Sequence, residues 1–167
     1  RQSQRAAQSA AGATGPAPPR KVRVAGNLPY NLSSPILFWL IERAERDAAF
    51  ADATIMLQRE VADRLVAKPG TKAYGVLSIL TQRHAAITRR LALPPAAFTP
   101  PPKVRSSLVR LTFHPPTPRV PDETRFAAMV KALFSQRRKM LANALKRFDP
   151  AGPDVLARSG LDGRRRP

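Results

Sequence analysis

An amide, a proline and an aromatic ring are neighbours in VRVAGNLPYNLSSPI, residues 22–36. Asn27 carries a side-chain oxygen that accepts hydrogen bonds, while Pro29 has no backbone N–H and holds Leu28 in extended geometry. The Asn27 oxygen and a backbone carbonyl of Leu28 or Pro29 are able to converge on one amino group. Tyr30 adds a ring that stacks on a flat partner. Such a set fits an exocyclic amine on a heteroaromatic base.

An amine of this kind is a poor nucleophile, because its lone pair is delocalised into the ring. Acceptors that hold both of its hydrogens favour a more pyramidal nitrogen, whose lone pair then faces an electrophile. This chemistry depends on proximity and preorganised dipoles, and it requires no strong general base. Taken alone, however, residues 27–30 are more typical of an ordinary turn, since Asn and Pro are common turn residues.

The surrounding elements place this turn at the end of a strand. Residues 22–25 predict a short strand, and Ser33, Ser34 and Pro35 predict the N-cap and first turn of a helix that runs to about residue 46. Residues 53–58, ATIMLQ, predict a strand buried on both faces of a parallel sheet. Ligands of doubly wound sheets bind beyond the carboxyl ends of the strands, where this turn lies.

The remaining pattern predicts an α/β part followed by helices. Helices are expected over 59–67 and 73–85, and strands over 87–93 and 107–113. This alternation up to about residue 113 predicts a parallel sheet. After a proline-rich link, residues 114–121, apolar residues at helical spacing predict an all-helical tail. His84 is interpreted as a structural histidine, because no partner has the spacing of a metal site or a catalytic triad.

The chain is strongly basic. Its 167 residues contain 29 Lys and Arg against 11 Asp and Glu, a formal net charge of +18, which is typical of proteins that bind nucleic acid or an anionic membrane surface. There are no cysteines, which excludes disulfides and thiolate metal sites, and no metal centre is expected. No apolar run approaches about 18 residues, the length of a membrane span. A cytoplasmic protein is therefore expected.

Four stretches of the chain share their order and residues with one known family. They are NLPYNLSSPILF, IMLQREVADRLVAKPGTKAYGVLSIL, AFTPPPKVRSSLVRL and LFSQRRKMLANAL. The series closely resembles the ribosomal RNA adenine N6,N6-dimethyltransferase family of the kasugamycin-resistance type. These enzymes use S-adenosylmethionine to dimethylate two adjacent adenines near the 3′ end of small-subunit rRNA. Erythromycin-resistance methylases share the fold.

The resemblance implies roles for particular residues. Asn27, with the backbone of Leu28 and Pro29, is expected to bind the adenine N6 amine next to the cofactor, S-adenosylmethionine. Tyr30 is expected to stack on an adenine flipped out of the RNA, and Phe98 to cover its other face. A core residue beneath the proline loop is the alternative interpretation of Phe98. Five cations are expected to contact RNA: Lys103, Arg105, Arg137, Arg138 and Lys139.

The fold implied is α/β, namely the C-terminal part of a Rossmann-like methyltransferase sheet followed by a small, truncated all-helical domain. Residues 1–20 are expected to be a disordered lead-in, residues 21–114 the second half of the catalytic domain, and residues 121–167 part of a helical RNA-binding domain. The family's glycine-rich loop and ribose-binding acidic residue are not found in the sequence. The chain is therefore expected to be a fragment that alone neither binds the cofactor well nor methylates RNA.

The function implied is dimethylation of two adjacent adenines of 16S rRNA in the immature 30S subunit, by a monomeric enzyme. A resistance-type methylase of 23S rRNA is one alternative, and a non-catalytic rRNA-binding or ribosome-assembly factor is another. A DNA adenine methylase is less favoured, because its tetrapeptide usually begins with Asp where this chain has Asn27.

Overall fold

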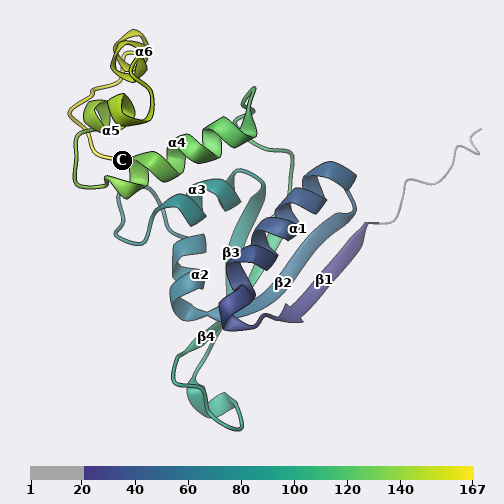
Figure 1. Ribbon diagram of the computed structural model, residues 1–167. Coiled ribbons are helices and arrows are strands. Elements are labelled where there is room, and N and C mark those ends of the chain that lie inside the picture. Colours follow the sequence, from purple (N-terminus) through teal and green to yellow (C-terminus); the bar gives the residue numbers. More distant parts are fainter. Residues whose placement is uncertain (1–20) are drawn as a thin grey trace, which may run out of the picture.

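The computed structural model describes residues 21–167, which include one mixed sheet and a helical tail (Figure 1). The disordered segment expected over residues 1–20 lies outside the described residues. The sheet contains β1 (Val22–Asn27), β2 (Phe50–Gln58), β3 (Ala85–Leu93) and β4 (Ser106–Phe113), in the spatial order β1-β2-β4-β3.

Strand directions differ from the expected parallel sheet. β1 and β2 are parallel, with Asn27 opposite Met56, whereas β4 runs antiparallel to both β2 and β3. The prediction of a parallel sheet is therefore wrong for β4. Residues 94–105, which connect β3 to β4, contain only a short 3-10 turn (Pro95–Ala97) in place of a crossover helix. Without a crossover the two strands pair as antiparallel neighbours.

Three helices accompany the strands of the α/β part: α1 (Ser33–Asp47), α2 (Arg59–Leu65) and α3 (Val76–Gln82). The helix predicted over 73–85 is too long, because Ala85 already belongs to β3. α1 lies across the face of β1 and β2, with Leu37 and Leu40 buried against the sheet (Figure 1). The fully buried strand residues below it are Ala53, Ile55, Leu57, Val109 and Leu111. This apolar layer fixes the position of the turn between β1 and α1.

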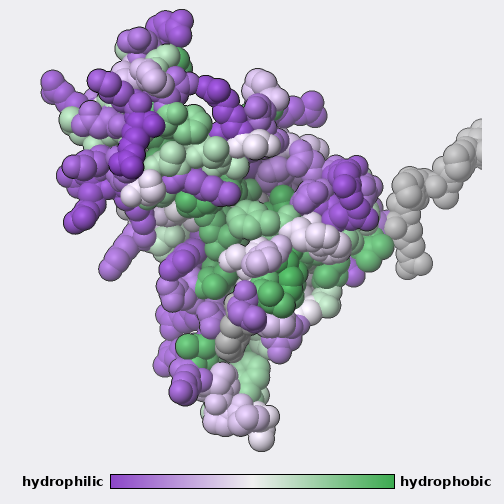
Figure 2. Space-filling model, in the orientation of Figure 1, coloured by the Kyte–Doolittle hydropathy of each residue, from purple (hydrophilic) through white to green (hydrophobic). Residues whose placement is uncertain are grey.

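The predicted helical tail consists of α4 (Glu123–Ser135), α5 (Leu141–Phe148) and α6 (Gly152–Arg158). The break predicted at SQRRK is confirmed, since α4 ends at Ser135 and a turn leads to α5. Gly152 permits close packing of α5 and α6, because a Cβ there would lie 2.9 Å from the Leu145 carbonyl oxygen. Hydrophilic residues crowd the surface of the tail (Figure 2). Within residues 21–167, every helix is too short or too polar to cross a membrane.

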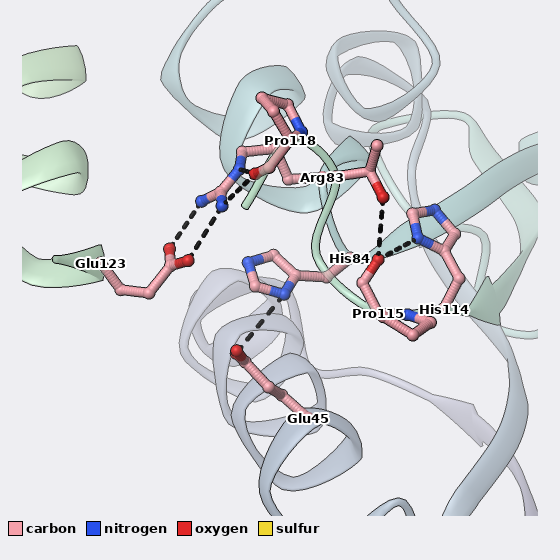
Figure 3. A network of polar contacts seen from close by, with 8 residues as sticks. Glu45, Arg83, His84, His114, Pro115, Pro118 and Glu123 are labelled. Atoms are coloured by element: carbon pink, nitrogen blue, oxygen red, sulfur yellow. Dashed lines mark hydrogen bonds and ion pairs between the residues drawn. The ribbon is translucent and has the colours of Figure 1, made fainter. Parts of the chain in front are cut away.

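A buried arginine joins the α/β part to the tail (Figure 3). Arg83, at the end of α3, donates to both carboxylate oxygens of Glu123 at 2.6 and 2.9 Å. It also donates to the carbonyl oxygen of Pro118, at 2.7 and 3.2 Å, and lies 4.4 Å from the centre of the Phe126 ring. Only 5% of Arg83 is exposed. These contacts hold the start of α4 against the end of α3.

Candidate active site

The turn after β1 extends from the carboxyl end of the strand. The N–H of Leu28 donates to the carbonyl of Met56 at 3.2 Å, which extends the pairing with β2 by one residue. Pro29 has no N–H with which to continue it. A 3-10 turn, Tyr30–Leu32, then leads directly into α1. The stretch therefore stands at the strand end where the sequence predicts it.

The two candidate carbonyls of the turn differ in their contacts. The carbonyl of Pro29 accepts hydrogen bonds from the Leu32 N–H and the Ser33 hydroxyl, each at 3.0 Å. Among residues 21–167 other than the undescribed side chain of Tyr30, no group makes a hydrogen bond to the carbonyl of Leu28 or to the side-chain amide of Asn27. Asn27 and Leu28 are therefore the acceptors that remain available to a ligand.

The prediction that Ser33 and Ser34 cap α1 ahead of Pro35 is wrong. Leu32 occupies the N-cap position of α1, and no side chain caps the helix there. The Ser33 hydroxyl instead bonds back to Pro29, and Pro35 is the third helical residue. Ser33 is 1% exposed, so this bond is shielded from water and ties the turn to the helix.

Two distant segments line one cavity of about 400 Å³ at this edge of the sheet. Asn27, Leu28 and Pro29 form one wall, and the loop between β3 and β4 forms the other through Phe98, Thr99, Pro100 and Pro102. Phe98 is half-buried and lines the cavity, so it is not a fully enclosed core residue. The backbone of Tyr30 belongs to the 3-10 turn, and its side chain lies outside the described part of the structure.

Met56 also lines the cavity, although the sequence analysis did not select it. Its position follows from the register, because Met56 on β2 lies opposite Asn27 on β1. The signal available in the sequence was the place of Met56 near the carboxyl end of a predicted buried strand. An unbranched thioether side chain there supplies an adaptable apolar floor.

None of the described residues that line the cavity carries an ionisable side chain. The cavity offers the Asn27 amide, backbone carbonyls and apolar surface. These groups suit a flat ring that carries an amino group, because an aromatic face and hydrogen-bond acceptors lie together.

The family model described as ribosomal RNA adenine dimethylase matches residues 15–162. The chain belongs to this family. Its sequence is 50% identical over 147 residues to ribosomal RNA small subunit methyltransferase A of Xylella fastidiosa strain 9a5c, covering 84% of this chain and 54% of that protein. It is 47% identical over 161 residues to the protein of the same name from Anaeromyxobacter sp. strain K, covering 94% and 55%. The chain thus spans about half the length of these relatives.

Solved structures support the same fold. A dimethyladenosine transferase from Plasmodium falciparum superposes with a TM-score of 0.73 at 24% identity, covering 90% of this chain and 62% of that one. The 23S rRNA methyltransferase ErmE superposes with a TM-score of 0.63 at 23% identity, covering 91% and 61%. The predicted fold class, the C-terminal part of a methyltransferase sheet followed by helices, is confirmed.

The cations predicted to contact RNA fall into two groups in this family member. Lys103 and Arg105, beside the cavity loop, and Arg138 and Lys139, between α4 and α5, are exposed. Arg137 differs, because its guanidinium donates to the carbonyls of Lys72 at 2.9 Å and Thr71 at 3.2 Å. The first group is free to approach phosphates, whereas Arg137 holds the loop before α3 to the end of α4.

His84 has the surroundings of a structural residue (Figure 3). Its side chain is 11% exposed, and Nδ1 lies 3.5 Å from a carboxylate oxygen of Glu45. Burial lowers the pKa of His84 below its ordinary value, and the attraction of Glu45 opposes that shift only in part. Among residues 21–167, no group of His, Cys, Asp and Glu side chains is arranged to hold a metal ion.

Proposed function

We propose that the protein containing this chain transfers methyl groups from S-adenosylmethionine to the N6 amines of two adjacent adenines near the 3′ end of 16S rRNA. The observation that carries this proposal is the convergence of the free Asn27 amide, the free Leu28 carbonyl and Phe98 on one cavity. Membership of the ribosomal RNA adenine dimethylase family supports it. So do relatives named ribosomal RNA small subunit methyltransferase A.

Asn27 and Leu28 act on the amine itself. The adenine ring enters between Phe98 and Tyr30, and its amine donates one hydrogen to the Asn27 oxygen and the other to the Leu28 carbonyl. Both hydrogens are then held on one side, which favours a pyramidal nitrogen with an exposed lone pair. The acceptors are fixed in advance, because the Leu28 N–H is bonded to Met56 and the Ser33 hydroxyl holds Pro29.

The described residues of the cavity supply no side-chain base for the proton. No ionisable side chain belongs to the described lining of the cavity, and the methylated nitrogen is strongly acidic, so the proton passes to water. Asn27 and Leu28 therefore raise the rate by positioning the amine and by the electrostatic effect of their oxygens on it.

S-adenosylmethionine supplies an electrophilic methyl group when bound. The described residues fit the adenine better than they fit this cofactor. β1 is an edge strand among the described strands, and Asn27 at its end is the one residue proposed to contact the cofactor. The described residues that line the cavity include no carboxylate and no glycine-rich loop that could hold the rest of the cofactor.

The substrate belongs to the same proposal. A net charge of +18 and the exposed Lys103, Arg105, Arg138 and Lys139 favour an RNA of the immature 30S subunit. Residues 21–114 then form the second half of the catalytic domain, and residues 121–167 part of an RNA-binding domain. The enzyme is proposed to act as a cytoplasmic monomer.

The test is methyl transfer by the complete protein to immature 30S subunits, with naked 23S RNA as the competing substrate. Asn27→Ala is expected to lower kcat by about 100-fold, the cost of losing one preorganised polar contact. Asn31→Ala is the matched control, since Asn31 is exposed in the adjacent 3-10 turn and does not line the cavity. Equal activity of Asn27→Ala and wild type, or transfer to 23S RNA alone, would contradict the proposal.

A further inference from the structure

A second cavity, of about 450 Å³, lies between the start of α1, the loop before α3 and the end of α4. Three aromatic and three cationic side chains contribute to it: Phe38, Tyr74 and Phe134, with Arg64, Lys72 and Arg137. We propose that this flanking cavity binds the nucleotide next to the target adenine in the same RNA strand. This inference rests on the function proposed above, and it adds a second contact point for the substrate.

The aromatic side chains give the flanking cavity surfaces suited to a base. Phe38 remains 38% exposed on α1, whereas its neighbour Leu37 is fully buried against the sheet. Tyr74 and Phe134 meet edge to face with their ring centres 6.2 Å apart, which joins the loop to α4. Hydrophobic surface gathers over α1 and α3, beside the hydrophilic tail (Figure 2). An exposed phenylalanine beside a rigid aromatic pair is a platform on which a base stacks.

The cations give the flanking cavity a positive charge. None of its described lining residues is acidic. Lys72 is exposed, and its ammonium has no partner among residues 21–167. Arg64 pairs with the exposed Glu60. Arg137 donates its hydrogen bonds to backbone carbonyls, which are neutral, so its positive charge is not compensated. A phosphate beside Lys72 would be attracted by this field.

The flanking cavity adjoins the active-site cavity. Pro29 lines the first and Ser34 the second, and the Ser33–Pro29 hydrogen bond lies between them. Five residues at a rise of about 1.5–2.0 Å each separate the two walls by roughly 10 Å or less. Consecutive nucleotides of one extended strand bridge a gap of this size. One strand can therefore place an adenine in the first cavity and its neighbour in the second.

A nucleotide fits this combination better than an apolar peptide or a lipid tail. Aromatic rings interleaved with cations are the pattern of single-stranded nucleic-acid sites, where bases stack and phosphates meet Lys and Arg. A groove for an apolar ligand would not place three cations at its wall. The charge of the whole chain, +18, has the same sign.

The test measures binding of the complete protein to a fluorescent RNA hairpin that carries the target adenines. Phe38→Ala and Lys72→Ala are each expected to weaken binding by about tenfold. Lys21→Ala is the matched control, because Lys21 is exposed next to Val22, at the opposite end of β1 from Asn27. Thermal unfolding of each variant establishes that the fold is retained, which the exposure of Phe38 and Lys72 favours.

Two further hairpins, one with an abasic residue before the target adenine and one with it after, separate the stacking contribution of Phe38 from the charge contribution of Lys72. On the hairpin that lacks the bound neighbouring base, Phe38→Ala is expected to match wild type, while Lys72→Ala still binds more weakly because the phosphate remains. If Phe38→Ala and Lys72→Ala bind every hairpin like wild type while Phe98→Ala binds weakly, nucleotide binding in the flanking cavity is contradicted and the adenine site is retained. If Phe98→Ala is also unchanged, the proposed function fails with it.

Discussion

Ser33 donates a 3.0 Å hydrogen bond from its buried hydroxyl to the carbonyl oxygen of Pro29, four residues earlier in the chain. The bond closes the turn between β1 and α1 and occupies the Pro29 carbonyl. The Asn27 amide and the Leu28 carbonyl are left as the free acceptors beside Phe98. One serine thus occupies a carbonyl oxygen of the turn that would otherwise be open to a ligand.

Ser33→Ala is expected to lower the free energy of unfolding by about 1 kcal/mol, because a buried hydrogen bond is lost. Urea denaturation measures the change. Ser34→Ala is the control and is expected to leave stability unchanged within about 0.5 kcal/mol, since Ser34 is exposed and caps nothing. Equal effects of the two substitutions would show that the bond to Pro29 contributes no stability.

Phe98→Ala in the complete protein is expected to weaken RNA binding by about 1–3 kcal/mol, the value of one base-stacking contact. Phe98→Trp keeps an aromatic face and is expected to retain most of the affinity. Fluorescence anisotropy with an adenine-containing hairpin measures both. Wild-type binding by Phe98→Ala would mean that the ring serves only the packing of the 94–105 loop.

Arg83→Ala is expected to destabilise the chain by about 2 kcal/mol, because it removes charged hydrogen bonds to Glu123 and leaves the Pro118 carbonyl without its donor. Arg43→Ala on α1 is the control, since its pair with Asp47 is partly exposed and worth about 0.5 kcal/mol. Thermal unfolding compares the two. Similar losses would show that the Arg83 contacts are no stronger than a surface ion pair.

Acidification is expected to destabilise the chain through His84. Burial lowers the pKa of His84 from its ordinary 6.5, against the attraction of Glu45 on α1 and Glu123 on α4 and with the repulsion of Arg83 and His114. The unfolded chain therefore binds a proton that the folded chain resists, so stability is fully present above pH 6.5 and falls as the pH drops below it.

His84→Gln is expected to flatten this loss, and melting temperatures between pH 8 and about 5 measure it. At pH 8 the imidazole is neutral in both states, so that measurement isolates the packing cost of the substitution. A variant that keeps the full acid sensitivity of wild type would assign it to other groups. Glu123 is not among those groups in this pH range, since its hydrogen bonds to Arg83 lower its pKa and its contribution is lost only below its ordinary 4.5.

Arg138→Ala and Lys139→Ala are expected to weaken RNA binding and to reduce the slope of log K against log salt by about 0.7–0.9 each, the effect of one lost phosphate contact. Arg137→Ala is expected to lower the melting temperature as well, because its guanidinium ties Thr71 and Lys72 to α4. Anisotropy titrations at several salt concentrations, with thermal unfolding, separate the two effects. An unchanged melting temperature for Arg137→Ala would contradict its anchoring role.

Much of this protein could be predicted from the sequence, because the deciding signals are local. The NLPY turn follows a short apolar strand, helical spacing marks α1 and the tail, and the order of four stretches indicates the family. The broken periodicity at SQRRK placed the turn before α5. These features depend on residues within one element or its ends, where side-chain pattern and turn chemistry determine the backbone.

The tertiary structure decided what depends on residues far apart in the chain. β4 inserts antiparallel between β2 and β3, which brings Phe98 to the cavity beside Asn27. Ser33 bonds to Pro29 instead of capping α1, and Arg137 anchors a loop more than sixty residues away. No local pattern encodes which oxygen stays free or which cation is occupied. Those outcomes follow from packing, which sets the neighbours of each polar group and so the hydrogen bonds that remain for a ligand.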